Sequence, residues 1–477
     1  MKNIKSKIKS AVLFSTALFA LQGCANQMDS NQKPNLNNTV EVWLTKADQS
    51  VKLQKQLSVG FSEISSQNPT ITIQPNTKYQ TVDGFGFSLT GGSVETINRL
   101  PTAERNNLLR ELFSNEEDAI RINYIRLSIG ASDLNGDVFS YNDLPAGEVD
   151  LELKKFSLEK DRAVINMLKD ILKMNPSIKI MATPWSPPVW MKDNGSTIGG
   201  ALQPKYYDVY AKYFVKYIQE MKKEGIVIDA ITPQNEPLHP GNNPSLLMIA
   251  EQQNEFVKGF LGPQFVKNGI ATKIVLYDHN CNKPEYPISI LNDHETRKYV
   301  DGSAFHLYEG DISALSKVYN AHPDKNLYFT EQWTGAKGSF DTDLLWHTKN
   351  VVIGSMLNWS KTALEWNVAN DENFNPHTPG GCTECKGAIT IDNSGNIKRN
   401  VGYYIIGHAS KFVPMNSVRI ASTKIQNVDA VAFLTPENKI VVIALNDTTS
   451  IQKFNIQVEN KKVELSLDPK SVATYIL

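Results

Sequence analysis

The chain has 477 residues, a length that allows two to four domains. Hydrophobic residues make up 41% and charged residues 21%, close to the globular average, which excludes fibrous and grossly disordered classes. Lys and Arg number 49 and Asp and Glu number 50, giving a formal net charge of -1. A chain this balanced has no bulk electrostatic attraction for nucleic acid or an anionic membrane.

The first 24 residues have the pattern of an export signal. Four lysines lie within residues 1–9, and the mainly apolar run Ala11–Leu21 follows. This run is too short for a bilayer span, which needs about 20 residues. Leu21-Gln22-Gly23-Cys24 resembles a bacterial lipobox, in which Cys24 becomes the lipidated first residue. We therefore expect export and a lipid anchor in the bacterial cell envelope, with residues 25–39 as a flexible tether.

Both ends of the remaining chain carry β-type patterns. Residues 40–81 contain short alternating runs such as Ile71–Ile73, and residues 413–477 contain similar runs such as Ile440–Ala444. Helical periodicity is nearly absent from both. Because the two segments bracket the rest of the chain, they predict one β-sandwich assembled from both ends; two independent β pieces are the alternative.

Residues 82–412 alternate strand and helix patterns. Helices are predicted from Pro101, from Ser157 as an N-cap to Met174, and over Tyr206–Glu224, where apolar residues follow helical spacing. Eight such strands favour a (β/α)8 barrel over a doubly wound sheet, which more often shows a Gly-rich phosphate loop. The predicted strands are Val82–Gly86, Tyr124–Ser128, Ile178–Thr183, Ala230–Pro233, Lys273–Tyr277, Gly302–Leu307, Leu327–Glu331 and Ala363–Asn367.

Polar and aromatic residues follow several of these strands. Barrel enzymes carry their chemistry at the carboxyl ends of the strands. Glu236 and Glu331 end otherwise apolar runs, and a buried carboxylate there needs a partner or a catalytic role. A salt bridge to Arg126 would explain one of them, but two glutamates among aromatic residues favour catalysis. The other candidates at strand ends are Asp133, Trp185, Asn235, His306, Tyr308 and Trp366.

Paired carboxylates with aromatic side chains suit glycoside cleavage. One carboxylic acid protonates the leaving oxygen, and the other carboxylate attacks or stabilises the oxocarbenium-like carbon. Burial and a second carboxylate both help to keep the acid protonated near neutral pH. Aromatic rings offer flat faces to the C–H side of a sugar. Protein carboxylates suffice for this chemistry, so we expect no metal and no cofactor.

Longer motifs carry a family resemblance. Val82–Gly86, Ala182–Lys192, Asn235-Glu236-Pro237 and Tyr403–Pro414 together resemble glycoside hydrolase family 30, the glucosylceramidase-like enzymes. The resemblance covers nearly everything from Val82 to the C-terminus. It implies a (β/α)8 barrel with a β-sandwich built from both chain ends, which agrees with the pattern of the flanks.

The resemblance also implies residue roles. Glu236 would be the general acid/base, Glu331 the nucleophile, and Asn235 the residue that binds the sugar 2-hydroxyl. His306 is either a catalytic residue or a hydrogen-bonded core histidine. The residues that would line the sugar subsite or touch the nucleophile are Asp133, Trp185, Tyr308 and Trp366.

Two departures from the lysosomal glucosylceramidases point to a branch of the family. Gln332-Trp333 adds a large ring, Trp333, at the mouth of the site, and residues 375–385 form a Gly- and Pro-rich loop. Both look more like the bacterial and fungal branch that includes endo-β-1,6-glucanases. The alternatives are an exo-acting β-glucosidase or glucosylceramidase, a β-xylosidase or β-fucosidase, and a non-catalytic glycan-binding lipoprotein. The expected partner is a β-glucan or β-glucoside, and no oligomeric state is predicted.

Cysteine spacing leaves two readings of the same loop. Cys382 and Cys385 could form half of a zinc site, but no second Cys or His pair has matching spacing. In an oxidising compartment a local disulfide is the better hypothesis. Cys281 is interpreted as a buried thiol.

Overall fold

The computed structural model describes residues 34, 36–61 and 66–477. The export signal, Cys24 and most of the predicted tether lie outside the described residues. Among the helices of the described part, none combines the length and apolarity needed to cross a bilayer.

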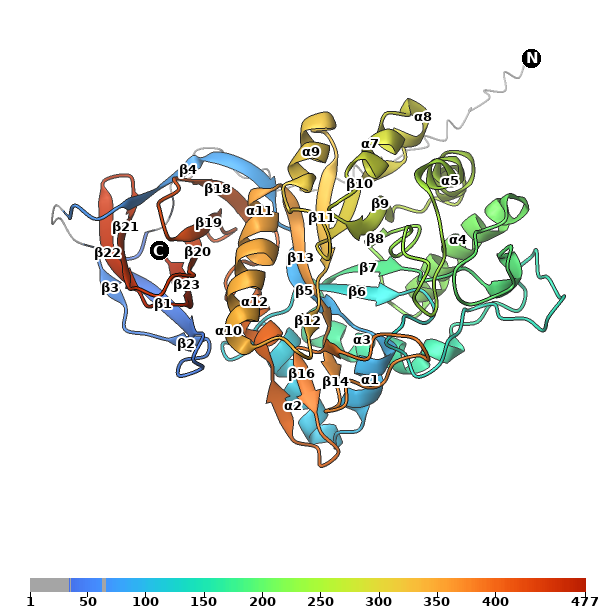
Figure 1. Cartoon of the computed structure of the whole chain (residues 1–477), viewed down its shortest axis with the longest axis horizontal. Coiled ribbons are helices and arrows are strands. Elements are labelled where there is room, and N and C mark those ends of the chain that lie inside the picture. Colours follow the sequence, from blue (N-terminus) through green and yellow to red (C-terminus); the bar gives the residue numbers. More distant parts are fainter. Residues whose placement is uncertain (1–33, 35, 62–65) are drawn as a thin grey trace, which may run out of the picture. The chain divides into compact units, whose positions relative to one another are not determined.

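Eight parallel strands close into a barrel in the centre of Figure 1, in the order β10-β11-β13-β5-β6-β7-β8-β9. The predicted (β/α)8 architecture is confirmed. The observed strands are β5 (Gly84–Ser88), β6 (Tyr124–Ser128), β7 (Lys179–Thr183), β8 (Ala230–Ile231), β9 (Lys273–Asn280), β10 (Val300–His306), β11 (Asn326–Glu331) and β13 (Ser360–Asn367).

Among the eight predicted strands only Tyr124–Ser128 has the observed bounds, and the other seven differ at one or both ends. β5 begins at Gly84 rather than Val82, because the N–H of Val82 donates to the backbone oxygen of Ser417, which lies outside the barrel. β8 ends at Ile231 rather than Pro233, where proline has no N–H to donate. Gly86 is required for closure: a Cβ there would lie 1.9 Å from the carbonyl oxygen of Tyr124 on the next strand.

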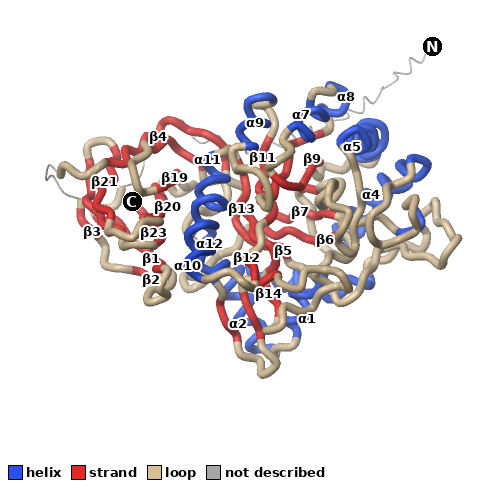
Figure 2. The backbone as a smooth tube through the Cα atoms, viewed as in Figure 1, coloured by secondary structure: helices blue, strands red, loops and turns tan. Residues whose placement is uncertain are grey.

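Helices cover the outside of the barrel (Figure 2). The helix predicted from Ser157 to Met174 is wrong at its start: Ser157 is not the N-cap, because a 3-10 turn over Glu159–Asp161 precedes α3. The helices are α1 (Gly91–Asn98), α2 (Thr102–Phe113), α3 (Arg162–Met174), α4 (Tyr207–Lys223), α5 (Ala250–Phe256), α6 (Gly262–Lys267), α7 (Glu285–Leu291), α8 (His294–Arg297), α9 (Ala314–Ala321), α10 (Phe340–His347), α11 (Ser355–Leu357) and α12 (Val401–Ser410), with π-helical turns at Val257–Leu261 and Thr348–Gly354 and further 3-10 turns at Val189–Met191 and Pro204–Tyr206.

One β domain combines both ends of the chain, so the alternative of two independent pieces is wrong. β1 pairs with β23, and β4 lies between β18 and β21 in a single ten-stranded sheet. Its own apolar core includes Ile71, Phe454 and Tyr475. The strands are β1 (Thr39–Lys46), β2 (Gln54–Lys55), β3 (Val59–Gly60), β4 (Thr70–Thr81), β18 (Val418–Ser422), β19 (Asp429–Leu434), β20 (Ile440–Asn446), β21 (Gln452–Val458), β22 (Lys461–Leu467) and β23 (Ser471–Ile476).

Short strands order the loops after β11 and β13. β12 (Thr334–Gly335) pairs with β15 (Cys385–Lys386), which ties these two loops together. β14 (Ala369–Asn370), β16 (Ile389–Ile391) and β17 (Ile397–Arg399) form a small three-stranded sheet.

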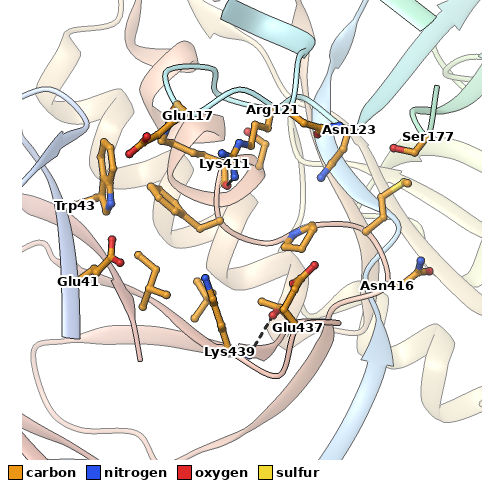
Figure 3. A pocket seen from close by; sticks show the side chains of 18 of the residues that line it. Glu41, Trp43, Glu117, Arg121, Asn123, Ser177, Lys411, Asn416, Glu437 and Lys439 are labelled. Atoms are coloured by element: carbon orange, nitrogen blue, oxygen red, sulfur yellow. Dashed lines mark hydrogen bonds between the residues drawn. The ribbon is translucent and has the colours of Figure 1, made fainter. Parts of the chain in front are cut away.

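A polar cavity of about 670 Å³ lies between barrel and β-domain residues (Figure 3). Its barrel residues Arg121 and Ser177 precede β6 and β7, so it lies at the amino ends of the strands. Lys411 in its wall donates to the backbone oxygen atoms of Glu117 and Ala119. Catalysis in this fold belongs to the opposite rim.

Candidate active site

The barrel interior changes from apolar to polar within two residues along each strand. Seven strands contribute one side chain each to an apolar layer: Tyr124, Met181, Ala230, Val275, Ala304, Tyr328 and Leu364. Since side chains alternate along a strand, the residue two positions further on points inward again. These positions hold buried polar or aromatic residues, among them Arg126, Thr183, Thr232, His306, Thr330 and Trp366. The site is built on this second layer.

A β-bulge brings Asp278 into the polar layer. Tyr277 and Asp278 have φ angles of 73° and 63°, and the register of β9 against β10 shifts there. The extra residue turns Asp278 inward, where it is fully buried. Sequence analysis missed Asp278 because the predicted fifth strand ended at Tyr277. The polar run Asp278-His279-Asn280 directly after that strand was the available signal.

Arg126 connects the acidic residues. Its guanidinium donates to Glu331 Oε2 at 2.6 Å, to Asn235 Oδ1 at 2.7 Å and to Asp278 Oδ2 at 2.9 Å. The predicted salt bridge of Arg126 to a glutamate is therefore present, with Glu331. Arg126 also binds Asn235, the residue before Glu236. Burial opposes ionisation of Asp278, yet the charge of Arg126 and the hydrogen bond from His306 hold its pKa well below the usual range.

Glu236 and Glu331 face each other across His306. One oxygen of each carboxylate and a ring nitrogen of His306 all lie within 4.8 Å of one another. His306 Nδ1 is 3.0 Å from Glu236 Oε1, and the Tyr308 hydroxyl donates to Glu331 Oε1 at 2.9 Å. Glu236 has a φ of 43°, a strained conformation of the kind that clusters at functional sites.

The electrostatics of this group are set by burial and by two cations. Burial would lower the pKa of His306, but the charge of Glu331 and the hydrogen bonds with Asp278 and Glu236 raise it to about 9. Burial raises the pKa of Glu331 against the opposing charges of His306 and Arg126. For Glu236 the effect of burial is outweighed by the hydrogen bond and charge of His306, which lower its pKa.

Aromatic rings and a loop form the walls of the site. Trp185 and Trp366 stack with ring centroids 5.3 Å apart, and the Arg126 guanidinium carbon lies 4.9 Å from the ring centroid of Trp185. Trp333 packs against the same cluster, as do Cys382 and Cys385, which are joined by a disulfide.

Asp133 is attached to this wall. The N–H of Cys382 donates to its Oδ2 at 3.3 Å. Burial, with the nearby charges of Glu331 and Glu236, raises the pKa of Asp133 to about 7. A carboxyl group with this pKa changes its charge close to neutral pH.

The candidates from the sequence converge on one cleft of about 390 Å³. Asp133, Trp185, Asn235, Glu236, Tyr308, Glu331, Trp333 and Trp366 all line it, and His306 lies buried between the two glutamates. Sequence analysis missed several further lining residues, which are His239, Asn242, His279, Asn280 and Glu309. His239 and Asn242 follow β8, so the strand-end rule that found Glu236 would have found them too.

Glu236, His306 and Glu331 have a spacing that could hold a metal ion. The surrounding contacts argue against that use. Both ring nitrogens of His306 are hydrogen-bonded to carboxylates, and Arg126 already neutralises Glu331 at 2.6 Å. A cation would have to displace these contacts and sit close to the guanidinium charge.

A buried glutamate pair at the carboxyl rim of a (β/α)8 barrel, in a cleft also lined by two stacked tryptophans, is characteristic of glycoside hydrolases. Residues 82–413 match the glycosyl hydrolase family 30 TIM-barrel domain, and residues 416–475 match the family 30 beta sandwich domain. The chain belongs to glycosyl hydrolase family 30.

Several relatives resemble most of the chain. An endo-1,6-beta-D-glucanase of Neurospora crassa is 34% identical, with 74% of this chain and 75% of the relative covered. The lysosomal acid glucosylceramidase of Mus musculus is 29% identical over 82% of this chain and 80% of the relative. The solved structure of an endo-beta1,6-glucanase superposes with a TM-score of 0.86 at 35% identity, covering 92% of this chain and 99% of that one.

Proposed function

We propose that this glycoside hydrolase cleaves β-1,6-glucan internally and with retention of configuration. The observation that carries the mechanism is the close approach of the two carboxyl groups: one oxygen of Glu236 lies within 4.8 Å of one oxygen of Glu331. Carboxyl groups of retaining enzymes lie about 5–5.5 Å apart, whereas inverting enzymes need about 6.5–9.5 Å to admit a water. The substrate assignment is supported by the endo-1,6-β-glucanases among the relatives.

In the first step Glu331 attacks the anomeric carbon while the bond to the leaving oxygen breaks and Glu236 protonates that oxygen. In the second step Glu236 takes a proton from water, whose oxygen displaces Glu331 and restores both carboxyl groups. Asn235 Oδ1 is already bonded to Arg126, so its amide N–H groups are free to bind the 2-hydroxyl.

The proton that Glu236 needs lies one hydrogen bond away. With its pKa raised to about 9, His306 is protonated at neutral pH and donates to both Glu236 and Asp278. Transfer of the Nδ1 proton makes Glu236 a neutral acid, and the imidazole still donates to Asp278 through Nε2. Burial raises the pKa of Glu331, and the charge of Arg126 and the hydrogen bond from Tyr308 oppose this by stabilising the carboxylate form that attacks.

Two variants separate the proposed roles on an aryl β-glucoside with a good leaving group. Glu331→Gln should lose more than roughly a thousandfold in kcat, because the covalent intermediate cannot form. Glu236→Ala should still form that intermediate, since such a leaving group needs no proton, and should show a burst followed by slow turnover. Wild-type turnover by either variant would contradict the assignment.

The product profile tests the substrate. A β-1,6-glucan should give a ladder of short oligosaccharides at early times. Free glucose alone, released from an aryl or lipid β-glucoside while the polymer stays intact, would favour the exo-acting glucosidase or glucosylceramidase. The glucosylceramidases among the relatives make that second activity the appropriate comparison.

We also propose that the enzyme is exported and lipidated at Cys24, on the lipobox-like sequence alone. Expressed in a bacterium, the wild-type protein should fractionate with membranes, and Cys24→Ala should appear in the soluble exported fraction with unchanged activity on the aryl glucoside. Identical fractionation of the two proteins would reject the anchor.

A further inference from the structure

A second cavity, of about 780 Å³, lies on the catalytic rim and has no part in the chemistry above. Val138–Val149 after β6, Ser186–Thr197 after β7 and Pro244 after β8 contribute to its lining, with Tyr206 from the turn before α4. All of these segments except Tyr206 follow the carboxyl ends of barrel strands. The cavity therefore opens on the same end of the barrel as Glu236 and Glu331.

The cavity and the catalytic cleft are lined by different residues of the same loops. Trp185 lines the cleft, and the next residue, Ser186, lines the cavity. In the loop after β8, Asn242 lines the cleft and Pro244 lines the cavity. Within each loop, one or two residues separate a residue of the cleft from a residue of the cavity, so the two hollows are neighbours on the catalytic rim.

Trp190 is a fixed aromatic surface in this cavity. Its indole Nε1 donates to the backbone oxygen of Asn142 at 3.0 Å and to the side-chain oxygen at 3.1 Å. Tyr206 packs edge-on against the ring, with centroids 5.2 Å apart. A ring held on its edge and at its N–H is ordered before any ligand arrives, which lowers the entropy cost of binding.

The charges around Trp190 suit a neutral ligand with many hydroxyl groups. At the exposed rim, Asp143 and Glu148 form ion pairs with Lys160 and Lys155, and Asp193 accepts the N–H of Ala201. Their remaining lone pairs can still accept hydrogen bonds from hydroxyl groups. Lys192 is the basic residue of the described lining, and its Nζ already donates to the backbone oxygens of Thr197 and Ser245. An anionic ligand would meet these carboxylates with no free cation to bind it.

We propose that this cavity is a distal subsite for the glucan, binding sugar units of the chain whose scissile bond lies between Glu236 and Glu331. The inference rests on the proposed function and adds a residue that determines chain-length preference. Trp190 stacks on a pyranose ring, and the rim carboxylates accept hydrogen bonds from its hydroxyls. Long substrates gain this contact, whereas an aryl β-glucoside is too short to reach it.

The test compares kcat/KM on an aryl β-glucoside with kcat/KM on β-1,6-gluco-oligosaccharides of increasing length. For the wild type the value should rise with length until the distal subsite is filled. Trp190→Ala should reduce the ratio of long-substrate to aryl-glucoside kcat/KM by roughly tenfold, chiefly through KM. Ala146→Trp places a large side chain on an exposed loop of the cavity and should have the same effect without disturbing Asn142.

Trp346→Ala is the matched control, since Trp346 is an exposed tryptophan on α10 outside the cavity. It should leave the ratio unchanged. A ratio that stays at the wild-type value in Ala146→Trp would overturn the distal subsite, whether or not Trp190→Ala folds. Failure of the proposed function is a different result: the wild type itself would not cleave the oligosaccharides at any length.

Discussion

Asp278 accepts hydrogen bonds from four side chains that lie on, or directly after, four different barrel strands. Arg126, Thr232, His306 and Thr330 converge on its two oxygens. Two of these partners contact the glutamates directly, so Asp278 acts through them as a positioning residue. Its charge both orients the guanidinium and keeps the imidazole protonated.

Removing that charge should change the pH profile as well as the rate. In Asp278→Asn the imidazolium of His306 loses an anionic partner, so its pKa falls from about 9. The alkaline limb of kcat/KM on an aryl β-glucoside should move to lower pH, with a loss of roughly a hundredfold at the optimum. Asp301→Asn, at the opposite end of β10, should keep the limb in place. An unmoved limb in Asp278→Asn would contradict the coupling.

Asp161 makes a separate prediction about stability. Burial raises its pKa from 3.8 to about 7, although the Tyr141 hydroxyl donates to it. Between these values the folded protein holds a proton that the unfolded chain has released, so the free energy of unfolding falls as pH rises. At about 1.4 kcal/mol per pH unit the change amounts to about 4 kcal/mol.

Asp161→Asn should remove this pH dependence and keep an acceptor for Tyr141. Denaturant unfolding at a series of pH values from 4 to 8 measures it. The variant should be the more stable protein at pH 8 and should lose its advantage toward pH 4. Parallel stability curves for the two proteins would exclude Asp161 as the titrating group.

At the scale of elements, the alternating pattern of the strands and the residues at their ends predicted most of the site from the sequence. The predicted strands placed Glu331 at the end of β11 and Asn235 and Glu236 just beyond β8, and the structure brings all three to one cleft. A bulge cannot be derived from a pattern of period two, because it adds one residue without changing the pattern on either side. The predicted fifth strand therefore ended at Tyr277, just before the bulged residue Asp278.

The predicted helix start at Ser157 also differs from the structure, although Ser157 makes the hydrogen bond expected of a capping residue. Ser157 Oγ does accept a backbone N–H, from Glu159, as a capping residue would. The turn that follows is 3-10, and the α-helix begins at Arg162. The hydrogen bond of Ser157 thus belongs to the 3-10 turn, and a serine at such a position does not distinguish a 3-10 start from an α-helical one.

Strand β5 offers a prediction about barrel closure. A methyl group at Gly86 would lie 1.9 Å from a backbone oxygen of β6, which cannot move without breaking the ladder. Gly86→Ala should therefore cost at least about 3 kcal/mol of unfolding free energy. Gly60→Ala, where a Cβ meets nothing within 4 Å, should be close to neutral. Urea unfolding of both proteins checks this, and equal stabilities would show that the barrel accommodates the methyl group.

At the scale of the whole molecule, α12 joins the barrel to the β domain. His408 on this helix bonds to Thr474 Oγ1 of β23 at 2.9 Å and to Thr45 Oγ1 of β1 at 2.8 Å. Phe85 of the barrel packs edge-on against Phe433 of β19. The first and last strands of the β domain thus share one buried histidine with the barrel, which predicts that the two unfold together.

His408 should make the contact between α12 and the β domain sensitive to acid. Burial lowers its pKa from 6.5 to about 3, so between these values the unfolded chain binds a proton that the folded protein excludes. Stability is therefore full above pH 6.5 and is lost as pH falls toward 3, the opposite sign to Asp161. His408→Gln keeps a donor and an acceptor between the two threonines without titrating. It should flatten the acid limb of the stability curve by about 3 kcal/mol at pH 4.

Because His408 links the two domains, the near-UV and far-UV circular dichroism signals should change in one transition as the protein unfolds. Separate transitions would show that the barrel and the β domain unfold independently.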